Sequence, residues 1–248
     1  MKIAIISDLH SNFTAVEAVL KKIAELKLDE VICLGDIVGY GPNPKEVIDL
    51  LVEHKIYSIL GNHDDAVLTE PKYFNRIPHE ALMWTKEVLQ APGNDKYIEY
   101  LSSLDLIKRG NGMVFTHGVM DNNMCYVEDT NDLLYIFDNL NDDEFICFGG
   151  HSHQASVWIK GENDISNVMI RQGEEYVPES KVQKVWVNVG SVGQPRDSDW
   201  RSSFFIYDTE SKGITPMRVE YDVDSTISQI QDIERLDNFL ADRLRRGQ

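Results

Sequence analysis

The chain has 248 residues, of which 41 are acidic and 24 basic, so its net charge is −17 at pH 7. A hydrophobic content of 42% is typical of a globular protein and excludes an intrinsically disordered chain. The shortage of clustered basic residues argues against non-specific binding to nucleic acid or to anionic membranes. No stretch approaches the roughly 18 apolar residues of a membrane helix, and the N-terminus lacks the apolar core of a signal peptide. We therefore expect a cytoplasmic protein without a membrane partner.

The first sixty residues alternate between short apolar segments and amphipathic segments. Strands are predicted at 2–7, 31–34 and 56–60, and helices at 12–27 and 44–53. This alternation predicts parallel strands joined by right-handed crossovers, which is the start of an α/β protein.

The pattern of apolar residues changes twice in the remainder of the chain. Residues 65–104 are predicted to form a helical insertion; strands at 113–116 and 145–148 flank a helix at 133–140. Short strands at 157–160, 167–171, 184–189, 204–207 and 215–221 favour a meandering antiparallel sheet, and one amphipathic helix is predicted at 225–245. No linker or repeat divides the chain, so we expect a single domain over residues 1–248. The insertion and the C-terminal helix could line the substrate entrance or form a dimer face.

Five of the seven histidines lie in short motifs that each follow a predicted strand. The motifs are DLH at 8–10, GNHD at 61–64, THG at 116–118 and GHSH at 150–153, and a GD pair at 35–36 follows a further strand. Because strand ends in an α/β sheet meet at one edge, we expect these side chains to come together. One histidine after a strand is more often structural than a ligand, but the repetition favours a site. His54 and His79 lack this context and are expected on the surface.

The side chains in these motifs suit divalent transition metals, because they are imidazole, carboxylate and amide. The three cysteines include no Cys-x-x-Cys pair, so a thiolate zinc site is excluded. The candidates are too many for one tetrahedral ion and suit two ions, about 3.5–4 Å apart, that share a carboxylate. They are Asp8, His10, Asp36, Asn62, His117, His151 and His153.

These motifs together resemble the signature of the calcineurin-like metallophosphoesterases: DxH, GDxxxxG, GNH[DE], a histidine before glycine, and GHxH. The resemblance runs from residue 3 to about residue 208. The segments GDIVGYGPNP and GSVGQPRD look like the bacterial and archaeal branch often labelled phosphodiesterase or diadenosine-tetraphosphatase-like. The resemblance implies an α/β (α+β) fold, a four-layer αββα sandwich of two mixed β-sheets flanked by helices. The chain departs from the family pattern at Val189, where proline is common, and at Ser152, where threonine is usual.

The resemblance also implies a ligand set: Asp8, His10 and His153 would bind the first metal, Asn62, His117 and His151 the second, and Asp36 would bridge both. The cofactors would be two divalent ions, Mn²⁺ first, with Fe²⁺, Zn²⁺ or Ni²⁺ also compatible. With a bridging hydroxide, the local charge would be about +1, which would attract a small phosphorylated substrate in spite of the acidic surface.

The implied reaction is hydrolysis of a small phosphodiester or phosphoanhydride of nucleotide type, by in-line attack of a metal-bridging hydroxide. His63 would stabilise the transition state or protonate the leaving oxygen. Asp64 would orient the His63 imidazole, or would only be a helix N-terminal residue.

Further residues are candidates for substrate contact. Arg196 and Arg201 could hold a second phosphate or carboxylate, or form surface ion pairs. Tyr40, Tyr73, Phe74 and Trp84 could stack on a nucleobase, although aromatic residues at helical spacing more often belong to the core.

Three other functions are compatible with parts of the pattern. A phosphomonoesterase would use the same ligands. A metal-binding scaffold for protein interactions would be expected to lose ligands or the catalytic histidine, and all are present. A protein Ser/Thr phosphatase would carry an RGxxS-type segment where this chain reads YGPNP. The sequence leaves open the physiological substrate and whether the chain forms a homo-oligomer.

Overall fold

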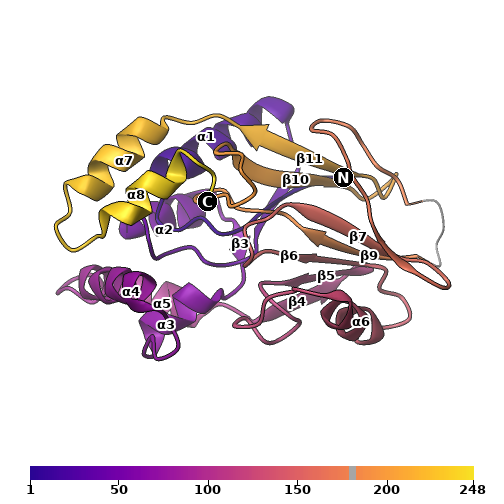
Figure 1. Cartoon of the computed structure of the whole chain (residues 1–248), viewed down its shortest axis with the longest axis horizontal. Helices are drawn as coiled ribbons and strands as arrows, with labels where there is room; N and C mark the ends of the chain where they lie inside the picture. The colour runs from indigo at the N-terminus through magenta and orange to yellow at the C-terminus, as the bar shows by residue number, and fades with distance from the viewer. Residues whose placement is uncertain (179–182) are drawn as a thin grey trace.

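The computed structural model describes residues 1–178 and 183–248. Its strands form two sheets that lie face to face, with helices on the outside (Figure 1). The first sheet has the order β11 (Ile214–Val219), β10 (Ser202–Asp208), β1 (Lys2–Ile6), β2 (Glu30–Cys33) and β3 (Tyr57–Ser58). The second has the order β4 (Ile107–Gly110), β5 (Met113–Thr116), β6 (Ile146–Gly149), β9 (Lys184–Asn188), β7 (Ser156–Lys160) and β8 (Ile165–Asn167).

The helices cover the outer faces of the two sheets. The first sheet packs against α1 (Phe13–Leu26), α2 (Pro44–Glu53), α3 (Asn62–Leu68), α4 (Arg76–Leu89) and α5 (Asp95–Ser102). The second sheet packs against α6 (Thr130–Asp138). The last two helices, α7 (Val223–Gln231) and α8 (Asn238–Leu244), share an apolar cluster with α4. The predicted helical insertion thus contains most of α3 and all of α4 and α5.

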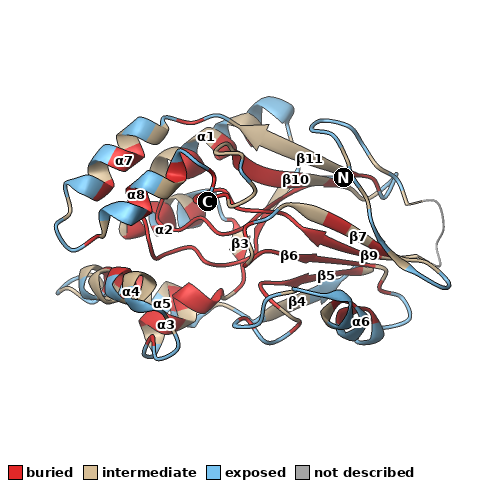
Figure 2. Cartoon of the chain, in the orientation of Figure 1, coloured by how far each residue is buried: buried red, intermediate tan, exposed pale blue. Residues whose placement is uncertain are grey.

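Strand β1 shows why the sheets are sandwiched. Ile3 and Ile5 point into the core between the sheets, where they join Phe148 and Val187 of the second sheet. Ala4 and Ile6 point to the opposite face and pack in the cluster that includes α1. Since successive side chains of a strand alternate between faces, a strand that is apolar throughout must be covered on both sides. The central strands are accordingly buried (Figure 2), and the four-layer αββα sandwich is confirmed.

The pairing of the strands confirms one topological prediction and corrects another. The strands β1, β2 and β3 are parallel neighbours, as predicted. The later strands do not form one antiparallel meander: β9 pairs in parallel with β6, while β10 pairs antiparallel with β1 in the other sheet. Periodicity reports which faces of a strand are buried but not which sheet the strand joins, so the meander was wrong.

The C-terminal helix predicted over 225–245 is two helices. Helix α7 ends at Gln231, and α8 begins after Asp237, whose carboxylate accepts a hydrogen bond from the Phe239 amide at 2.9 Å. Ile233 and Leu236, in the intervening turns, pack with both helices in the same apolar cluster. The apolar pattern therefore continues through a break in the helix.

Two strands of the second sheet also differ from the prediction. Strand β8 begins at Ile165 rather than at residue 167, because a tight turn in which the Gly161 amide donates to the Asp164 carbonyl starts the pairing early. Strand β4 was not predicted.

Among the described residues, no helix combines the length and the apolar character needed to cross a bilayer.

Candidate metal centre and substrate cavity

The predicted ligands follow the carboxyl ends of five strands. Asp8 and His10 follow β1, Asp36 follows β2, and Asn62 follows β3. His117 follows β5, and both His151 and His153 follow β6. Parallel pairing within each sheet brings these ends to one edge, and the packing of the two sheets brings the two edges together.

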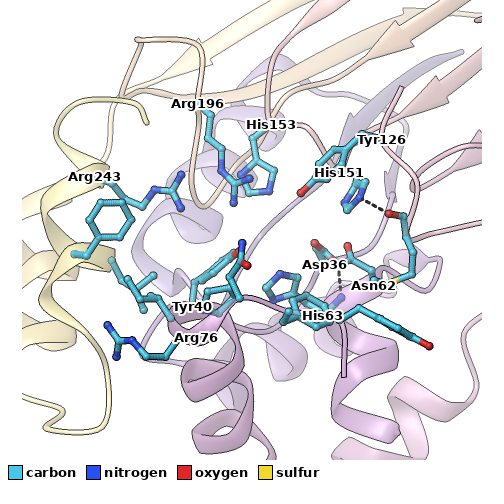
Figure 3. A pocket seen from close by; sticks show the side chains of 18 residues that line it. Asp36, Tyr40, Asn62, His63, Arg76, Tyr126, His151, His153, Arg196 and Arg243 are labelled. Carbon is cyan, nitrogen blue, oxygen red and sulfur yellow. Dashed lines mark hydrogen bonds between the residues drawn. The ribbon is translucent and has the colours of Figure 1, made fainter. Parts of the chain in front are cut away.

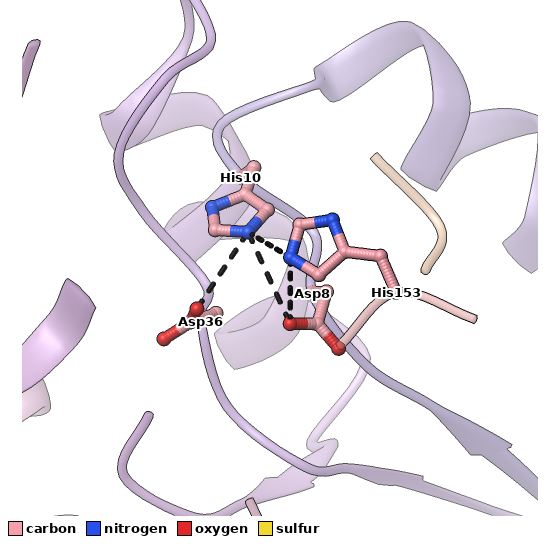
Figure 4. Close-up of side chains that lie close together, drawn as sticks. All are labelled: Asp8, His10, Asp36 and His153. Atoms are coloured by element: carbon pink, nitrogen blue, oxygen red, sulfur yellow. Dashed lines mark hydrogen bonds and ion pairs between the residues drawn. The ribbon is translucent and has the colours of Figure 1, made fainter. Parts of the chain in front are cut away.

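Four of these residues form a first group: Asp8, His10, Asp36 and His153 (Figure 4). The Nε2 atoms of His10 and His153 are 3.0 Å apart. His153 Nε2 lies 3.1 Å from Asp8 Oδ1, and His10 Nε2 lies 3.6 Å from Asp36 Oδ2. All four side chains are buried, so their donor atoms converge on one small volume away from solvent.

A second group contains Asp36, His117 and His151. His117 Nε2 lies 3.3 Å from Asp36 Oδ1 and 3.0 Å from the side-chain oxygen of Asn62. Asp36 therefore belongs to both groups, with Oδ2 facing His10 and Oδ1 facing His117.

Backbone carbonyls hold the other nitrogen of each imidazole. Nδ1 of His10, His117 and His153 lies 3.2, 2.8 and 2.6 Å from the carbonyl oxygens of Val38, Leu34 and Gln194, respectively. Nδ1–H donation to these oxygens leaves the lone pair of Nε2 turned toward the cluster. His151 is reversed: its Nε2 lies 3.3 Å from the Met124 carbonyl, which leaves Nδ1 for the cluster.

The charges of the cluster suit a cation. Burial lowers the pKa values of His10 and His153, and it lowers the pKa of His151 to about 3, so these imidazoles are neutral at pH 7. Burial also disfavours the protonated form of His117, but the Asp36 carboxylate outweighs it and raises the pKa of His117 to about 9. Burial opposes ionisation of Asp8, yet the neighbouring His153 keeps the pKa of that carboxyl low.

Three observations indicate that these side chains fit a divalent metal ion. Two neutral imidazoles with Nε2 atoms 3.0 Å apart repel through their lone pairs unless a cation or proton lies between them. The Asn62 side-chain oxygen faces Nδ1 of His151 and the Asp36 carboxylate, so its amide nitrogen would be favoured there if no cation were bound. Imidazole, carboxylate and amide ligands with satisfied outer partners fit a divalent transition metal.

The backbone at the cluster is held in a conformation that is costly for residues other than glycine. Left-handed φ angles, from 46° to 67°, occur at five of the seven candidate ligands: Asp8, His10, Asp36, His151 and His153. Each costs about 1–2 kcal/mol. Cross-loop hydrogen bonds hold part of this geometry: the Asp8 amide donates to the Gly35 backbone carbonyl at 3.0 Å, and the His10 amide donates to the Asp36 backbone carbonyl at 2.9 Å. Such clustered strain is typical of functional sites.

His63 lies beside the cluster, and the Asp64 carboxylate binds backbone amides instead of the His63 ring in the described part of the chain. The His63 amide donates to Asp36 Oδ1 at 2.8 Å, and its buried ring Nδ1 has no hydrogen-bond partner among the described residues. Asp64 accepts from the amides of Ile37, Val38 and Gly61 at 2.9, 3.1 and 3.0 Å. These contacts fit the alternative interpretation of Asp64 as a helix N-terminal residue; they give no support to an orienting contact with the His63 ring.

A cavity of about 640 Å³ opens beside the cluster (Figure 3). Its wall includes Asp36 and His63 and also two of the predicted substrate contacts, Tyr40 and Arg196. The Tyr40 ring packs on the rings of His10 and His63, with centroid distances of 4.6 and 4.5 Å, and the Arg196 guanidinium lies 5.7 Å from its centroid. Tyr40 thus joins the cluster to Arg196.

The other aromatic and basic candidates divide between cavity and scaffold. Phe74 lines the cavity and contacts the His63 ring edge-on at 5.0 Å, and the exposed Tyr73 lies at the rim. Trp84 packs in the apolar cluster of α7 and α8, which is the core alternative. Arg201 is paired with Asp199, with Nη2 and Oδ2 2.6 Å apart, which is the ion-pair alternative.

The cavity wall also contains residues that the sequence did not predict, among them Tyr126, Phe239 and Arg243. Tyr126 stacks on His151 with ring centroids 3.8 Å apart and planes 10° apart. Phe239 and Arg243 reach the cavity from α8. None of these three residues lies in a recognisable motif. The amphipathic pattern of the C-terminal segment predicts a helix that contains Phe239 and Arg243, but it does not show which part of the protein this helix contacts.

A two-sheet sandwich with an imidazole–carboxylate cluster at its strand ends has the architecture and ligands of a metal-dependent hydrolase. Comparison with known proteins agrees. Residues 1–212 match the model of the calcineurin-like phosphoesterase superfamily domain. The chain therefore belongs to the calcineurin-like phosphoesterases, a family of metal-dependent enzymes, as the sequence motifs predicted.

Individual relatives extend the match over the whole chain. An uncharacterized protein of Methanocaldococcus jannaschii is 36% identical over 98% of this chain and 96% of its own length. A metallophosphoesterase from Sphaerobacter thermophilus is 32% identical, covering 100% of this chain and 99% of its own, with a TM-score of 0.84. A hypothetical protein from Pyrococcus horikoshii OT3, 21% identical over 100% of this chain and 98% of its own, shares the fold with a TM-score of 0.79.

Proposed function

We propose that this chain is a dinuclear metal-dependent phosphoesterase that hydrolyses a small phosphodiester or phosphoanhydride of nucleotide type. The observation that carries this proposal is the position of Asp36. Its two carboxylate oxygens face different imidazoles, His10 at 3.6 Å and His117 at 3.3 Å, and it is common to both groups of metal-ligating side chains. A shared carboxylate is the element that a two-metal site requires.

The seven candidates divide into two ligand sets around that carboxylate. Asp8, His10 and His153 would hold one ion with Asp36, and Asn62, His117 and His151 would hold the other with Asp36. Bound there, the two ions would supply Lewis-acid activation of the attacking water and would neutralise charge on the phosphoryl oxygens. We propose Mn²⁺ as the physiological ion, because three of the seven ligands offer oxygen. A site with only nitrogen and sulfur ligands would suit Mn²⁺ less well.

His63 would assist departure of the leaving group. Its ring lines the cavity next to Asp36, and its backbone amide is fixed by the Asp36 carboxylate. Burial lowers the pKa of His63 to about 4 in the metal-free protein, so the ring is neutral until an anionic substrate favours its protonation. His63 would then hold the proton that the leaving oxygen takes.

The cavity wall supports a nucleotide-type substrate. Phe74 and the exposed Tyr73 provide aromatic faces near the cluster, and Arg196 provides a cation. A base or aryl group could stack against this wall while a phosphoryl group reaches the metals. Tyr40 would contribute mainly by fixing His10, His63 and Arg196, because its ring is only 8% exposed.

The test uses the full-length protein, stripped with chelator and restored with Mn²⁺, Fe²⁺, Zn²⁺ or Ni²⁺ separately. Turnover is measured on a bis-aryl phosphodiester, a mono-aryl phosphate and a dinucleoside tetraphosphate. We expect turnover only with metal, and the first and third substrates to be preferred over the monoester. His63→Ala should lose about 10²–10⁴-fold on the substrate with the poorer leaving group, and Asp36→Ala should lose all metal-dependent turnover.

His54→Ala serves as the matched control, because His54 is exposed at the end of α2 and belongs neither to the cavity wall nor to the two groups of candidate ligands. Its activity should equal that of the wild type. Two bound ions without turnover on any substrate would contradict the enzyme and favour a metal-binding scaffold. If the mono-aryl phosphate is the preferred substrate, the chain is a phosphomonoesterase and not a phosphodiesterase.

A further inference from the structure

Two arginines in the cavity differ from most other arginines of the protein. Of the ten arginines in the chain, seven lie within 4.0 Å of a side-chain carboxylate among the described residues: Arg76, Arg109, Arg171, Arg201, Arg218, Arg235 and Arg245. That pairing is expected in a chain with 41 acidic residues. Arg196 and Arg243 have no such partner in the described part of the chain, although both are half-buried and both line the cavity.

Hydrogen bonds and a ring contact hold the two side chains. Nε and Nη2 of Arg196 donate to the side-chain oxygen of Gln194 at 3.3 and 2.9 Å. Nε of Arg243 donates to the main-chain oxygen of Gln248, and its guanidinium lies 5.4 Å from the Phe239 ring centroid. The two terminal nitrogens of Arg243 have no hydrogen-bond partner among the described residues. Figure 3 shows both guanidinium groups directed into the cavity and toward each other.

The two charges act on each other. Burial and the charge of Arg196 lower the pKa of Arg243 to about 10. Arg243 therefore remains a cation at neutral pH, and the two half-buried cations repel. An anion bound between them would relieve this repulsion and form charge-assisted hydrogen bonds with donors that are already oriented.

The two cations are connected to the metal cluster through the cavity wall. Arg196 follows the loop in which Gln194 O accepts from His153 Nδ1, and its guanidinium packs over Tyr40. Arg243 approaches from the other direction, on α8, which is anchored by the buried Leu240 and Leu244. An anion on the two arginines would therefore share the cavity with the group that reaches Asp36 and His63.

We infer that Arg196 and Arg243 form a subsite for a second phosphoryl group of the substrate, in addition to the group that is hydrolysed. This inference rests on the proposed function and deepens it: the substrate would be a phosphorylated compound with at least two phosphoryl groups. Arg243 lies outside residues 1–212 that match the family domain, so the C-terminal helix pair would add this specificity to the common fold.

The first test compares two substrates with the same leaving group. One is the p-nitrophenyl ester of a nucleoside 5′-monophosphate, and the other is the terminal p-nitrophenyl ester of the matching nucleoside 5′-triphosphate. We expect the wild type to favour the longer substrate in kcat/KM. Arg243→Gln should reduce that preference by about 10- to 100-fold, mainly through KM, because a bidentate contact to phosphate is lost. Arg243→Lys, which keeps the charge, should restore part of it.

The matched control is Arg246→Gln, an exposed arginine three residues further along that does not line the cavity. It should leave the preference unchanged. Thermal unfolding of each variant checks that α8 still packs. An equal preference in wild type and Arg243→Gln, with both proteins folded and active, would overturn the subsite and leave the proposed hydrolase standing.

The second test does not depend on turnover. Calorimetry measures binding of inorganic tripolyphosphate and of orthophosphate to the metal-loaded protein, with metal in excess. We expect wild type to bind tripolyphosphate more tightly than orthophosphate, and Arg243→Gln to lose about 10-fold or more in tripolyphosphate affinity. If this loss occurs in a protein without turnover, the subsite stands while the proposed hydrolysis fails. Unchanged tripolyphosphate binding by folded Arg243→Gln would overturn the inference.

Discussion

Gly39 illustrates how the site depends on single residues that carry no chemistry. It has a φ of +90°, and a Cβ atom built on it would lie 3.2 Å from Cγ of His63 and closer still to the ring Nδ1. Glycine is thus required twice, for its backbone conformation and because the His63 ring lies against it. The GDIVGYG segment positions the histidine that we propose as the proton donor.

We predict that Gly39→Ala displaces the His63 ring and lowers turnover by at least about 10-fold, since a misplaced catalytic group loses its geometry. The left-handed φ adds a loss of about 1–2 kcal/mol in the free energy of unfolding. Turnover on the bis-aryl phosphodiester and urea unfolding measure the two effects separately.

Gly93→Ala is the matched control for this variant. Gly93 has a φ of +87°, but its added Cβ would meet nothing within 4 Å. It should show the loss of stability without the loss of turnover. A Gly39→Ala enzyme as active as Gly93→Ala would refute the positioning role of Gly39.

At this scale the metal-ligating candidates were predictable from sequence, and their surroundings were not. Each candidate sits in a short motif directly after an apolar strand, so local pattern and general topology suffice to bring Asp8, Asp36 and His117 together. Arg243 and Tyr126 enter the same cavity from segments without a motif. Their positions depend on how α8 and the loop before α6 pack, which is information that no local pattern contains.

At the scale of elements, Asn12 connects three parts of the fold near the cavity. Its side-chain oxygen accepts from the Ala15 amide at 3.2 Å, which caps α1, and from the Thr226 hydroxyl of α7 at 2.9 Å. Its amide nitrogen donates to Gly193 O at 2.8 Å. Gly193 precedes Gln194, whose carbonyl faces His153. Asn12 thus ties α7 and the late loop to the start of α1.

We predict that Asn12→Ala lowers the free energy of unfolding by about 2–4 kcal/mol, because it removes a helix cap and leaves the buried partners of α7 and the late loop unsatisfied. Chemical denaturation measures the change. The control is Asn43→Ala at the N-terminus of α2, where the side chain makes no capping bond; it should change stability by less than about 0.5 kcal/mol. A loss for Asn12→Ala no larger than that for Asn43→Ala would contradict the connecting role of Asn12.

The elements themselves were predicted unequally. The alternation of β1, α1, β2, α2 and β3 was recognisable because each strand is apolar on both faces and each helix on one. The partners of β9 and β10 were not, because their pattern is the same in either sheet. The C-terminal segment was predicted as one helix because Ile233 and Leu236 continue its apolar pattern through the turns between α7 and α8.

At the scale of the whole molecule, the two sheets enclose a cluster that is costly without cations. Opposed imidazoles and the carboxylates of Asp8 and Asp36 are buried at the junction of both sheets, so ions bound there would link loops from both. In the unfolded chain this arrangement does not exist, and metal binding therefore adds to the free energy of unfolding.

We predict that restoring metal to the chelator-treated protein raises the midpoint of thermal unfolding. An ion at 100 times its Kd adds about 2.7 kcal/mol, which corresponds to roughly 5–10 °C in a protein of this size. Asp36→Asn should reduce the shift strongly, whereas Asp65→Asn, one turn into α3 and outside the cluster, should keep it. Equal shifts in the two variants would contradict the ligand set.

We propose that two ions share Asp36 and that hydrolysis requires both. The most direct measurement is a titration of chelator-treated protein with Mn²⁺, in which bound metal per chain and turnover on the bis-aryl phosphodiester are recorded on the same samples. We predict saturation at two ions per chain, with turnover following the doubly occupied protein. Full turnover at one ion per chain, or hydrolysis by protein that retains no metal, would contradict a two-ion site at Asp36.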